Sequence, residues 1–274
     1  MPELAEVEYF RRKWDLALRC KVRKVETNGT ARIFREAPAA LLEGKLAGTT
    51  LLESFAAAKQ MLFRFSANQW LGLHLGMTGR LLCEAESYAV GKWDHFVLRQ
   101  RGRTLVFRDP RQFGLLKHHE GESPPEWWTS LPPAILSTAF TIEAMCAILD
   151  RRKKSPLKAV LLMQERFPGV GNWMADEILW RAKLHPAMRA GSLSAEQRET
   201  LYGKVREVCA DALHAIAGVG EDAPPPDLNV NIPDDWLFWH RWKDGGYCPI
   251  HGLELIRETI GGRTSAWCPQ CQGG

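Results

Sequence analysis

The sequence predicts an α+β protein: an N-terminal β-sandwich domain with flanking helices, then a C-terminal helical domain that ends in a zinc-ribbon finger. Three observations support this fold class. Short apolar stretches typical of strands recur closely up to about residue 118. Beyond a proline-rich break, apolar residues recur at helical spacing instead. The C-terminal end holds two closely spaced pairs of metal-ligating residues.

The N-terminal domain is expected to begin with a helix and to continue mainly as strands. Residues 3–18 carry apolar side chains at spacings of three and four, which predicts a helix. Strands are expected at residues 22–25, 60–65, 70–75, 96–99 and 104–107. Residues 100–103, between the last two strands, are typical of a hairpin turn.

The second half of the chain changes from strands to helices. Periodicity predicts helices at residues 142–149, 156–167, 173–183 and 195–216. Ser194 is expected to cap the last helix, with Gln197 completing a capping box. The boundaries that follow are an N-terminal domain 1–122, a linker 123–136, a helical domain 137–220, a variable Trp-rich segment 221–246 and a finger 247–274.

Composition narrows the class of protein. The chain has 274 residues, of which 45% are hydrophobic and 25% charged, and this excludes a disordered or collagen-like protein. No apolar run is long enough to span a membrane, and the N-terminus lacks a secretory signal, so a cytoplasmic protein is expected. The net charge of +4 permits a polyanionic partner without requiring one.

The C-terminal ligand pairs predict one structural zinc ion. Cys248 and His251 form the first pair, and Cys268 and Cys271 form the second, sixteen residues further on. Four ligands leave no open coordination position, so this Zn²⁺ is expected to hold structure rather than to catalyse; the alternative is chance clustering. A Gly-Gly turn between the pairs places Arg263 just past the tip of a hairpin. There it suits phosphate recognition, or it is an ordinary solvated arginine.

The N-terminus offers a chemical possibility. Methionine followed by a small proline is a good substrate for removal of the initiator residue, which would leave Pro2 with a free secondary amine. An α-amine titrates near about 8, so much of it is unprotonated at neutral pH and able to attack an aldehyde-like carbon. Glu3 lies beside it as a possible general acid. Met-Pro starts are common, so this motif alone is weak.

Two further regions hold groups that could contact nucleic acid. A Gly-rich turn joins two helices, and Asn172 in that turn could cap the second helix or donate to a phosphate. Residues 74–77 and 109–114 are turn-rich loops that carry Met77 and Phe113. Such side chains unstack bases in proteins that bend DNA, although taken singly they are more often core residues.

Several separate motifs match one family in the same order. The sequence resembles the Fpg/Nei DNA glycosylases, that is, the formamidopyrimidine-DNA glycosylase or MutM-like family, nearly from end to end. The matching stretches are residues 1–8, Lys59, 74–77, 109–114, 169–177, 185–186, Arg263 and 268–271. The start is closer to Fpg than to Nei. The resemblance implies a helix–two-turn–helix in the second domain and damaged double-stranded DNA as the partner.

The resemblance also implies roles for individual residues. It places catalysis on Pro2, Glu3, Lys59 and Arg263. In this scheme Pro2 attacks C1′ of the damaged nucleotide, Glu3 protonates the sugar ring oxygen, and Lys59 engages a phosphate near the lesion. The other DNA contacts implied are a phosphate clamp of His74, Asn172 and Arg263, and a set that fills the gap left by the extruded nucleotide, Met77, Arg111 and Phe113.

The implied activity is that of a bifunctional DNA glycosylase/AP lyase of base excision repair. It would excise oxidised bases, namely 8-oxoguanine and formamidopyrimidines, through an N-terminal proline Schiff base with β,δ-elimination. Three single-residue departures bear on this. Ala5 replaces a proline, Gln112 replaces an arginine of the DNA face, and His251 replaces a cysteine ligand.

A fourth departure, in residues 221–244, leaves base specificity open. This stretch contains three consecutive prolines and three tryptophans at helical spacing that are expected to pack inward, Trp236, Trp239 and Trp242. One alternative is therefore a Nei-like preference for oxidised pyrimidines or hydantoins. Another is a DNA-damage binding homologue with weak or lost catalysis. We expect a monomer in a bacterial-type cytoplasm, associated with the nucleoid.

Overall fold

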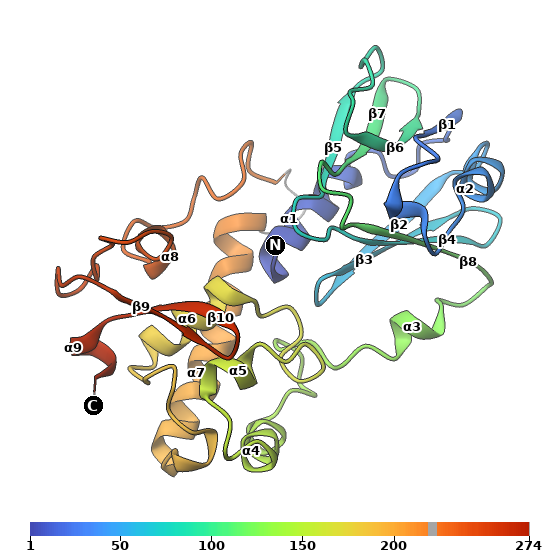
Figure 1. The fold of residues 1–274 in the computed structure, drawn as a ribbon. Coiled ribbons are helices and arrows are strands. Elements are labelled where there is room, and N and C mark those ends of the chain that lie inside the picture. Colours follow the sequence, from blue (N-terminus) through green and yellow to red (C-terminus); the bar gives the residue numbers. More distant parts are fainter. Residues whose placement is uncertain (219–223, 274) are drawn as a thin grey trace. The chain divides into compact units, whose positions relative to one another are not determined.

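The computed structural model describes residues 1–218 and 224–273 and divides into two compact units (Figure 1). Unit 1 comprises Met1–Leu131 and Ala217–Leu228, and unit 2 comprises Pro132–Ile216 and Asn229–Gly274. The N-terminal sheets, the helices of unit 2 and the C-terminal hairpin confirm the α+β prediction. Within the described ranges, no helix is both long and apolar enough to cross a membrane.

Unit 1 is built on two antiparallel four-stranded sheets, with strand orders β1-β6-β7-β5 and β2-β3-β4-β8. The strands are β1 (Lys24–Thr27), β2 (Leu51–Ala57), β3 (Gln60–Phe65), β4 (Gln69–His74), β5 (Arg80–Ala85), β6 (Asp94–Arg99), β7 (Arg103–Arg108) and β8 (Leu115–Glu120). Side chains alternate between the faces of each sheet, and Phe63, Phe96 and Phe107 are fully buried. Their burial supplies much of the hydrophobic stabilisation of this unit.

Helix α1 (Leu4–Asp15) contacts strands of both sheets. Its Trp14 is fully buried, with the ring centroid 4.8 Å from that of Phe63. The indole N–H of Trp14 donates to the carbonyl of Leu82 at 3.1 Å. The helix ends three residues before the predicted end because residues 16–19 form turns that lead to β1. This anchoring fixes the chain end that precedes α1.

In its described residues, unit 1 also contains three shorter helical segments: η1 (Arg32–Phe34), α2 (Ala39–Leu46) and α3 (Glu126–Thr129). The α3 segment lies on the sheet that contains β4. A Cβ added at Gly72 of β4 would come within 2.3 Å of the Trp127 ring, so only glycine leaves room for this ring. Trp127 therefore holds α3, close to the end of the first segment of unit 1, against the sheet that contains β4.

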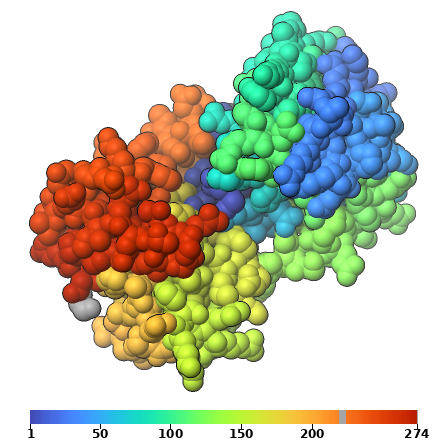
Figure 2. Space-filling view, in the orientation of Figure 1, coloured from blue at the N-terminus to red at the C-terminus, as the bar shows by residue number. Residues whose placement is uncertain are grey.

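Unit 2 consists of helices and one hairpin. The helical segments are α4 (Ile142–Arg151), α5 (Leu157–Leu161), α6 (Asn172–Arg181), η2 (Ala190–Ser192), α7 (Ala195–Ala212), η3 (Leu213–Ala217), α8 (Leu237–His240) and α9 (Pro269–Gln272). The last residue of η3 belongs to unit 1. The hairpin pairs β9 (Ile256–Ile260) with β10 (Arg263–Trp267). Ser194 caps α7 in the predicted capping box with Gln197. Figure 2 shows the C-terminal residues, in red, lying against the helices of this unit.

Two predicted helices are shorter in the structure. The helix predicted over residues 156–167 is limited to α5, because the side chain of Gln164 donates to the carbonyls of Leu162 and Val170 and stabilises a turn there. The helical spacing of the Trp-rich segment yields only the four residues of α8. Residues 221–223 of that segment lie outside the described residues.

Candidate functional site

The predicted functional residues divide between the two units. Unit 1 carries Pro2, Glu3, Lys59, His74, Met77, Arg111 and Phe113. Unit 2 carries Asn172, Arg263 and the four predicted ligands, Cys248, His251, Cys268 and Cys271.

The N-terminal end is held by the first turn of α1. Glu3 is the N-cap residue of this helix, is 3% exposed and forms a reciprocal capping box with Glu6. The backbone N–H of Glu3 donates to Oε2 of Glu6 at 3.1 Å. Pro2 is partly buried directly before it, whereas Met1 is exposed. Removal of Met1 would therefore leave the Pro2 amine beside a carboxylate whose position is fixed.

Lys59 and His74 lie at one end of the sheet that contains β3 and β4. Lys59 is buried in the turn between β2 and β3, and the next residue, Gln60, pairs with His74. Nδ1 of His74 accepts the backbone N–H of Gly76 at 3.0 Å, so the neutral ring carries its proton on Nε2. Burial, and then nearby cations of which Lys59 is the strongest, lower the pKa of His74. At neutral pH this ring is therefore an uncharged donor.

Met77 and Phe113 lie on two touching loops of unit 1. Their side chains are 43% and 40% exposed, which excludes a core placement. A Cβ added at Gly76 would come within 2.4 Å of the backbone carbonyl carbon of Phe113, so the loops are in direct contact. The guanidinium of Arg111 lies 4.8 Å from the centroid of the Phe113 ring. The structure thus brings Met77, Arg111 and Phe113 into one exposed group.

Asp109 holds both of these loops, a role that the sequence analysis did not assign. Its fully buried carboxylate accepts the hydroxyl of Thr78 and the backbone N–H of Gly114, each at 2.7 Å. Thr78 directly follows Met77, and Gly114 directly follows Phe113. The Asp-Pro pair was visible in the sequence as a turn signal, but its contact across 31 residues is visible only in the structure.

In unit 2, the side chain of Asn172 does not cap helix α6, so that alternative is wrong. Gly171 is the N-cap residue, and Asn172 is the first residue of the helix. Nδ2 of Asn172 instead donates to the carbonyl of Thr264 at 2.9 Å. Because Arg263 directly precedes Thr264, the structure brings the two predicted phosphate-binding residues of unit 2 together.

Arg263 begins the second strand of the hairpin, directly after its tip. Gly261 and Gly262 have φ values of 62° and 77° and form the predicted two-residue turn, with Arg263 paired to Ile260. A Cβ at Gly261 would lie 2.7 Å from Cβ of Ala159, so the tip rests on α5. Glycine is required there for both conformation and space. The side chain of Arg263 is exposed and free to face a ligand.

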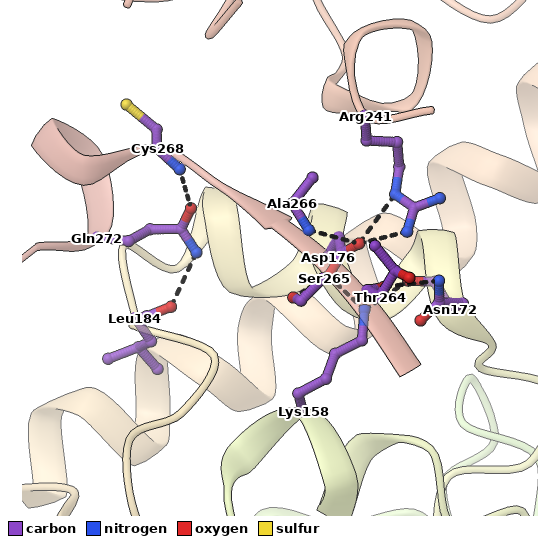
Figure 3. A network of polar contacts seen from close by, with 10 residues as sticks. All are labelled: Lys158, Asn172, Asp176, Leu184, Arg241, Thr264, Ser265, Ala266, Cys268 and Gln272. Atoms are coloured by element: carbon purple, nitrogen blue, oxygen red, sulfur yellow. Dashed lines mark hydrogen bonds and ion pairs between the residues drawn. The ribbon is translucent and has the colours of Figure 1, made fainter. Parts of the chain in front are cut away.

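One buried carboxylate ties the hairpin to the helices (Figure 3). Oδ1 of Asp176 in α6 accepts from Nζ of Lys158 and from the hydroxyl of Ser265, the latter at 2.6 Å. Oδ2 of Asp176 accepts from two nitrogens of the Arg241 guanidinium, with Nε at 2.9 Å. All four side chains are buried. The sequence does not reveal this network, because its members come from four separate segments.

The same network positions both phosphate-binding candidates of unit 2. The backbone N–H of Ala266, three residues after Arg263, donates to Asp176 at 3.3 Å. Lys158, which Asp176 holds, also donates to the backbone carbonyl of Asn172 at 2.8 Å. Asp176 therefore acts on the start of α6 and on β10 at once.

Asp176→Asn is expected to destabilise unit 2 by about 3–5 kcal/mol, because Lys158 and Arg241 would remain buried without their anion. Denaturant unfolding should show this loss, and amide exchange of β10 should accelerate. Asp150→Asn is the matched control, since Asp150 forms only an exposed pair with Arg198. Equal stabilities of the two variants would contradict the structural role of the network.

The neighbouring carboxylate, that of Glu177, holds the Trp-rich segment. It is fully buried and accepts from Nε of Arg181 at 2.9 Å and from the backbone N–H of Phe238 at 3.2 Å. Burial raises the pKa of Glu177 even though Arg181 opposes the shift. Consecutive acidic residues of α6 thus fix two different C-terminal segments.

The prediction that all three tryptophans pack inward is wrong for two of them. Trp236 is buried, but Trp239 and Trp242 are 44% and 53% exposed. Both meet the ring of Phe238 edge-on, with centroids 5.0 and 5.4 Å apart. Because α8 is only four residues long, the tryptophans do not share one continuous helical face.

Cys248, His251, Cys268 and Cys271 form a cluster that can hold a metal ion. Their ligand atoms all lie within 4.8 Å of one another. The sulfurs of Cys248 and Cys271 are 3.7 Å apart, and two sulfurs bound at about 2.3 Å to one tetrahedral ion would be about 3.8 Å apart. Nδ1 of His251 lies 3.2 Å from the sulfur of Cys271. The donor set and its spacing therefore fit a tetrahedral cation.

The protonation of these thiols would depend on a bound cation. Burial, and then the neighbouring thiols of Cys268 and Cys248, raise the pKa of Cys271 to about 12. A bound cation reverses this effect, because a coordinating thiol is deprotonated. Gln272 fixes the cluster to unit 2, since its amide accepts the N–H of Cys268 and donates to the carbonyl of Leu184, each at 2.9 Å.

Comparison with known proteins places the chain among DNA glycosylases. The model of the formamidopyrimidine-DNA glycosylase N-terminal domain matches residues 1–116, and that of the formamidopyrimidine-DNA glycosylase H2TH domain matches residues 131–221. A formamidopyrimidine-DNA glycosylase of Thermus thermophilus is 36% identical over 281 aligned positions, covering 100% of this chain and 99% of the relative. One from Alkalilimnicola ehrlichii is 34% identical and covers 99% and 100%.

Solved structures share the fold over the same length. The Lactococcus lactis Fpg bound to abasic-site DNA has a TM-score of 0.84 at 23% identity and covers 98% of this chain and 99% of that chain. MutM bound to DNA containing carbocyclic 8-oxo-G has a TM-score of 0.85 at 23% identity and covers 100% of both chains.

Proposed function

This chain belongs to the formamidopyrimidine-DNA glycosylase family, and we propose that it is a bifunctional DNA glycosylase/AP lyase that excises oxidised bases. The substrates proposed first are 8-oxoguanine and formamidopyrimidines in double-stranded DNA. The observation that carries the proposal is the N-terminal end, where Pro2 directly precedes the buried N-cap carboxylate of Glu3. A DNA-damage binding homologue would have no need for this pair.

The proposed chemistry uses the Pro2 amine as the nucleophile. Its nitrogen attacks C1′ of the damaged nucleotide, and the base leaves with the electron pair of the C1′–base bond and takes up the proton that the amine loses. Glu3 then protonates the ring oxygen, so that the bond from C1′ to that oxygen breaks and the sugar opens. A secondary amine has no second proton to lose, so the product is a cationic iminium. The iminium acidifies the C2′ proton, and loss of that proton breaks the bond to the 3′ phosphate. A second elimination breaks the bond to the 5′ phosphate.

Contacts to the DNA backbone support this chemistry. Extrusion of a nucleotide from a stacked duplex costs a few kcal/mol. Phosphate contacts from His74, Asn172 and Arg263 offset that cost, and the exposed group of Met77, Arg111 and Phe113 fills the gap. Lys59 is proposed to engage the phosphate next to the lesion. We propose a monomer that acts on DNA in the bacterial cytoplasm.

The metal proposed for the Cys–His cluster is one zinc ion, bound through three sulfurs and Nδ1 of His251. With four protein ligands, the ion would have no open position for substrate, so its contribution is structural. It would hold the hairpin that carries Arg263.

The Trp-rich segment favours a second class of damaged bases as substrates. Trp239 and Trp242 are exposed, and they belong to the stretch that departs most from the family pattern. Aromatic faces of this kind stack on unpaired bases. Oxidised pyrimidines or hydantoins are therefore the alternative substrates, and a panel of duplexes with different lesions would rank them.

Glu3→Gln tests the assignment of the acid. We expect base excision from a duplex with an oxidised base to fall by about 10²–10⁴-fold, because a positioned proton donor is lost. Cleavage of a preformed abasic site should fall less, since no base has to leave. Glu8→Gln, on the same helix but paired with Arg11, is the matched control.

Two outcomes would count against this scheme. Equal losses of rate on the two substrates would mean that Glu3 has no specific role in base release. Tight binding of damaged duplexes by the wild-type protein with no cleavage of any of them would favour the binding homologue instead.

A further inference from the structure

A cavity of about 200 Å³ lies beside His74 on the sheet β2-β3-β4-β8. It is lined by Gln60, Leu73, His74, Leu115 and Lys117. Gln60 pairs with His74, and His74 pairs with Leu115, so these three side chains share one face of the sheet. Lys117 lies two residues beyond Leu115 in β8 and points to the same face.

Positive charge surrounds this cavity. Lys117 lines it, and Lys59, Arg35 and Lys117 all act electrostatically on His74. The carboxylate of Glu36 pairs with Lys117 at 3.6 Å and is 51% exposed. An ion pair this exposed is weak and does not prevent Lys117 from binding another anion. The balance of charge therefore attracts an anion to the cavity.

Lys117 is held in position by Trp127. Its Nζ lies 5.0 Å from the centroid of the Trp127 ring. The ring occupies the space over Gly72, and Gly72 pairs with Lys117 across β4 and β8. Because the ammonium group is already restrained, it loses less freedom on binding than an unrestrained surface lysine would.

The cavity also offers neutral donors. His74 presents Nε2–H, because its Nδ1 accepts from Gly76, and Gln60 presents a side-chain amide. A phosphate group has several acceptor oxygens, so it suits one cation surrounded by donors.

We propose that this cavity binds a phosphodiester of DNA, with Lys117 as the cation and Gln60 as a donor beside His74. The inference rests on the proposed function and adds two residues to the predicted DNA contacts. The contact positions the DNA backbone and does not read base sequence.

The salt dependence of DNA binding tests this position. Affinity of the full chain for a duplex with a stable abasic-site analogue is measured between about 50 and 200 mM salt. Lys117→Gln is expected to weaken binding several-fold and to reduce the slope of log K against log salt by about 1.

Lys24→Gln is the matched control, because it removes the same charge from an exposed lysine of β1 in the other sheet. It should keep the wild-type slope. Lys117→Arg should restore the slope, since it keeps the charge, and thermal unfolding checks that each variant folds.

The outcomes separate the two proposals. Equal slopes for Lys117→Gln, Lys24→Gln and wild type would overturn the phosphate position and leave the proposed function intact. A slope lost in Lys117→Gln and not restored in Lys117→Arg would also overturn it, because charge would not be the cause. A wild-type protein without salt-dependent binding would contradict the proposed function and this position together.

Discussion

Replacing Pro2 with glycine is expected to slow borohydride trapping of the protein on an abasic-site duplex by on the order of a hundredfold or more. With proline, the adduct at C1′ is a permanently cationic iminium, to which hydride adds to leave a stable C–N bond. With glycine, the terminal amine is primary, and its imine is uncharged until it is protonated. Glycine also removes the ring that restricts the nitrogen next to Glu3.

Mass spectrometry of the trapped species checks the identity of the nucleophile, which should be residue 2 with Met1 removed. Pro38→Gly, at the N-cap position of α2, is the control for a proline change in the same unit. Undiminished trapping by Pro2→Gly would contradict the assignment. The candidate nucleophile would then be Lys59, the other amine among the predicted catalytic residues.

Local features of this fold were predictable because short-range physics determines them. The hairpin turn at residues 100–103 connects β6 and β7, and the Ser194 capping box begins α7, as expected. The Gly261–Gly262 turn was predictable for the same reason, since both residues have positive φ. In each case the determining residues lie within a few positions of one another.

Contacts between distant segments were not predictable from the same patterns. Asp176 and Ser265 are 89 residues apart, and Asn172 and Thr264 are 92 apart. The neighbours of Asn172 in the sequence predict either a helix cap or a phosphate donor, whereas its side chain donates to a strand of the finger. Periodicity failed for Trp239 and Trp242 because it assumes a helix longer than the four residues of α8. Lys117 lies outside all the motifs that predicted functional residues.

Removal of the proposed zinc is expected to unfold the finger, here residues 247–273, and to lower DNA affinity by at least about tenfold. Zinc contributes about 10–16 kcal/mol of apparent binding free energy in small structural sites, which is comparable to the stability of a whole domain. Without it, the two buried thiols of Cys248 and Cys268, the partly buried thiol of Cys271 and one imidazole lose their common partner. Arg263 would then be held without the metal, through the contacts that β10 makes with Asp176 and Asn172.

The measurement is chelation followed by metal analysis, DNA binding at fixed salt and amide exchange of both units. Unit 1 should keep its exchange pattern, because its sheets and α1 form a separate core. Cys268→Ser should reproduce the effect of chelation, whereas Cys209→Ser, in α7 outside the cluster, should not. His251→Cys should retain zinc, since four cysteines are also a normal structural set. If the chelated protein bound DNA as tightly as the untreated protein at the same salt, the hairpin carrying Arg263 would have no part in DNA binding.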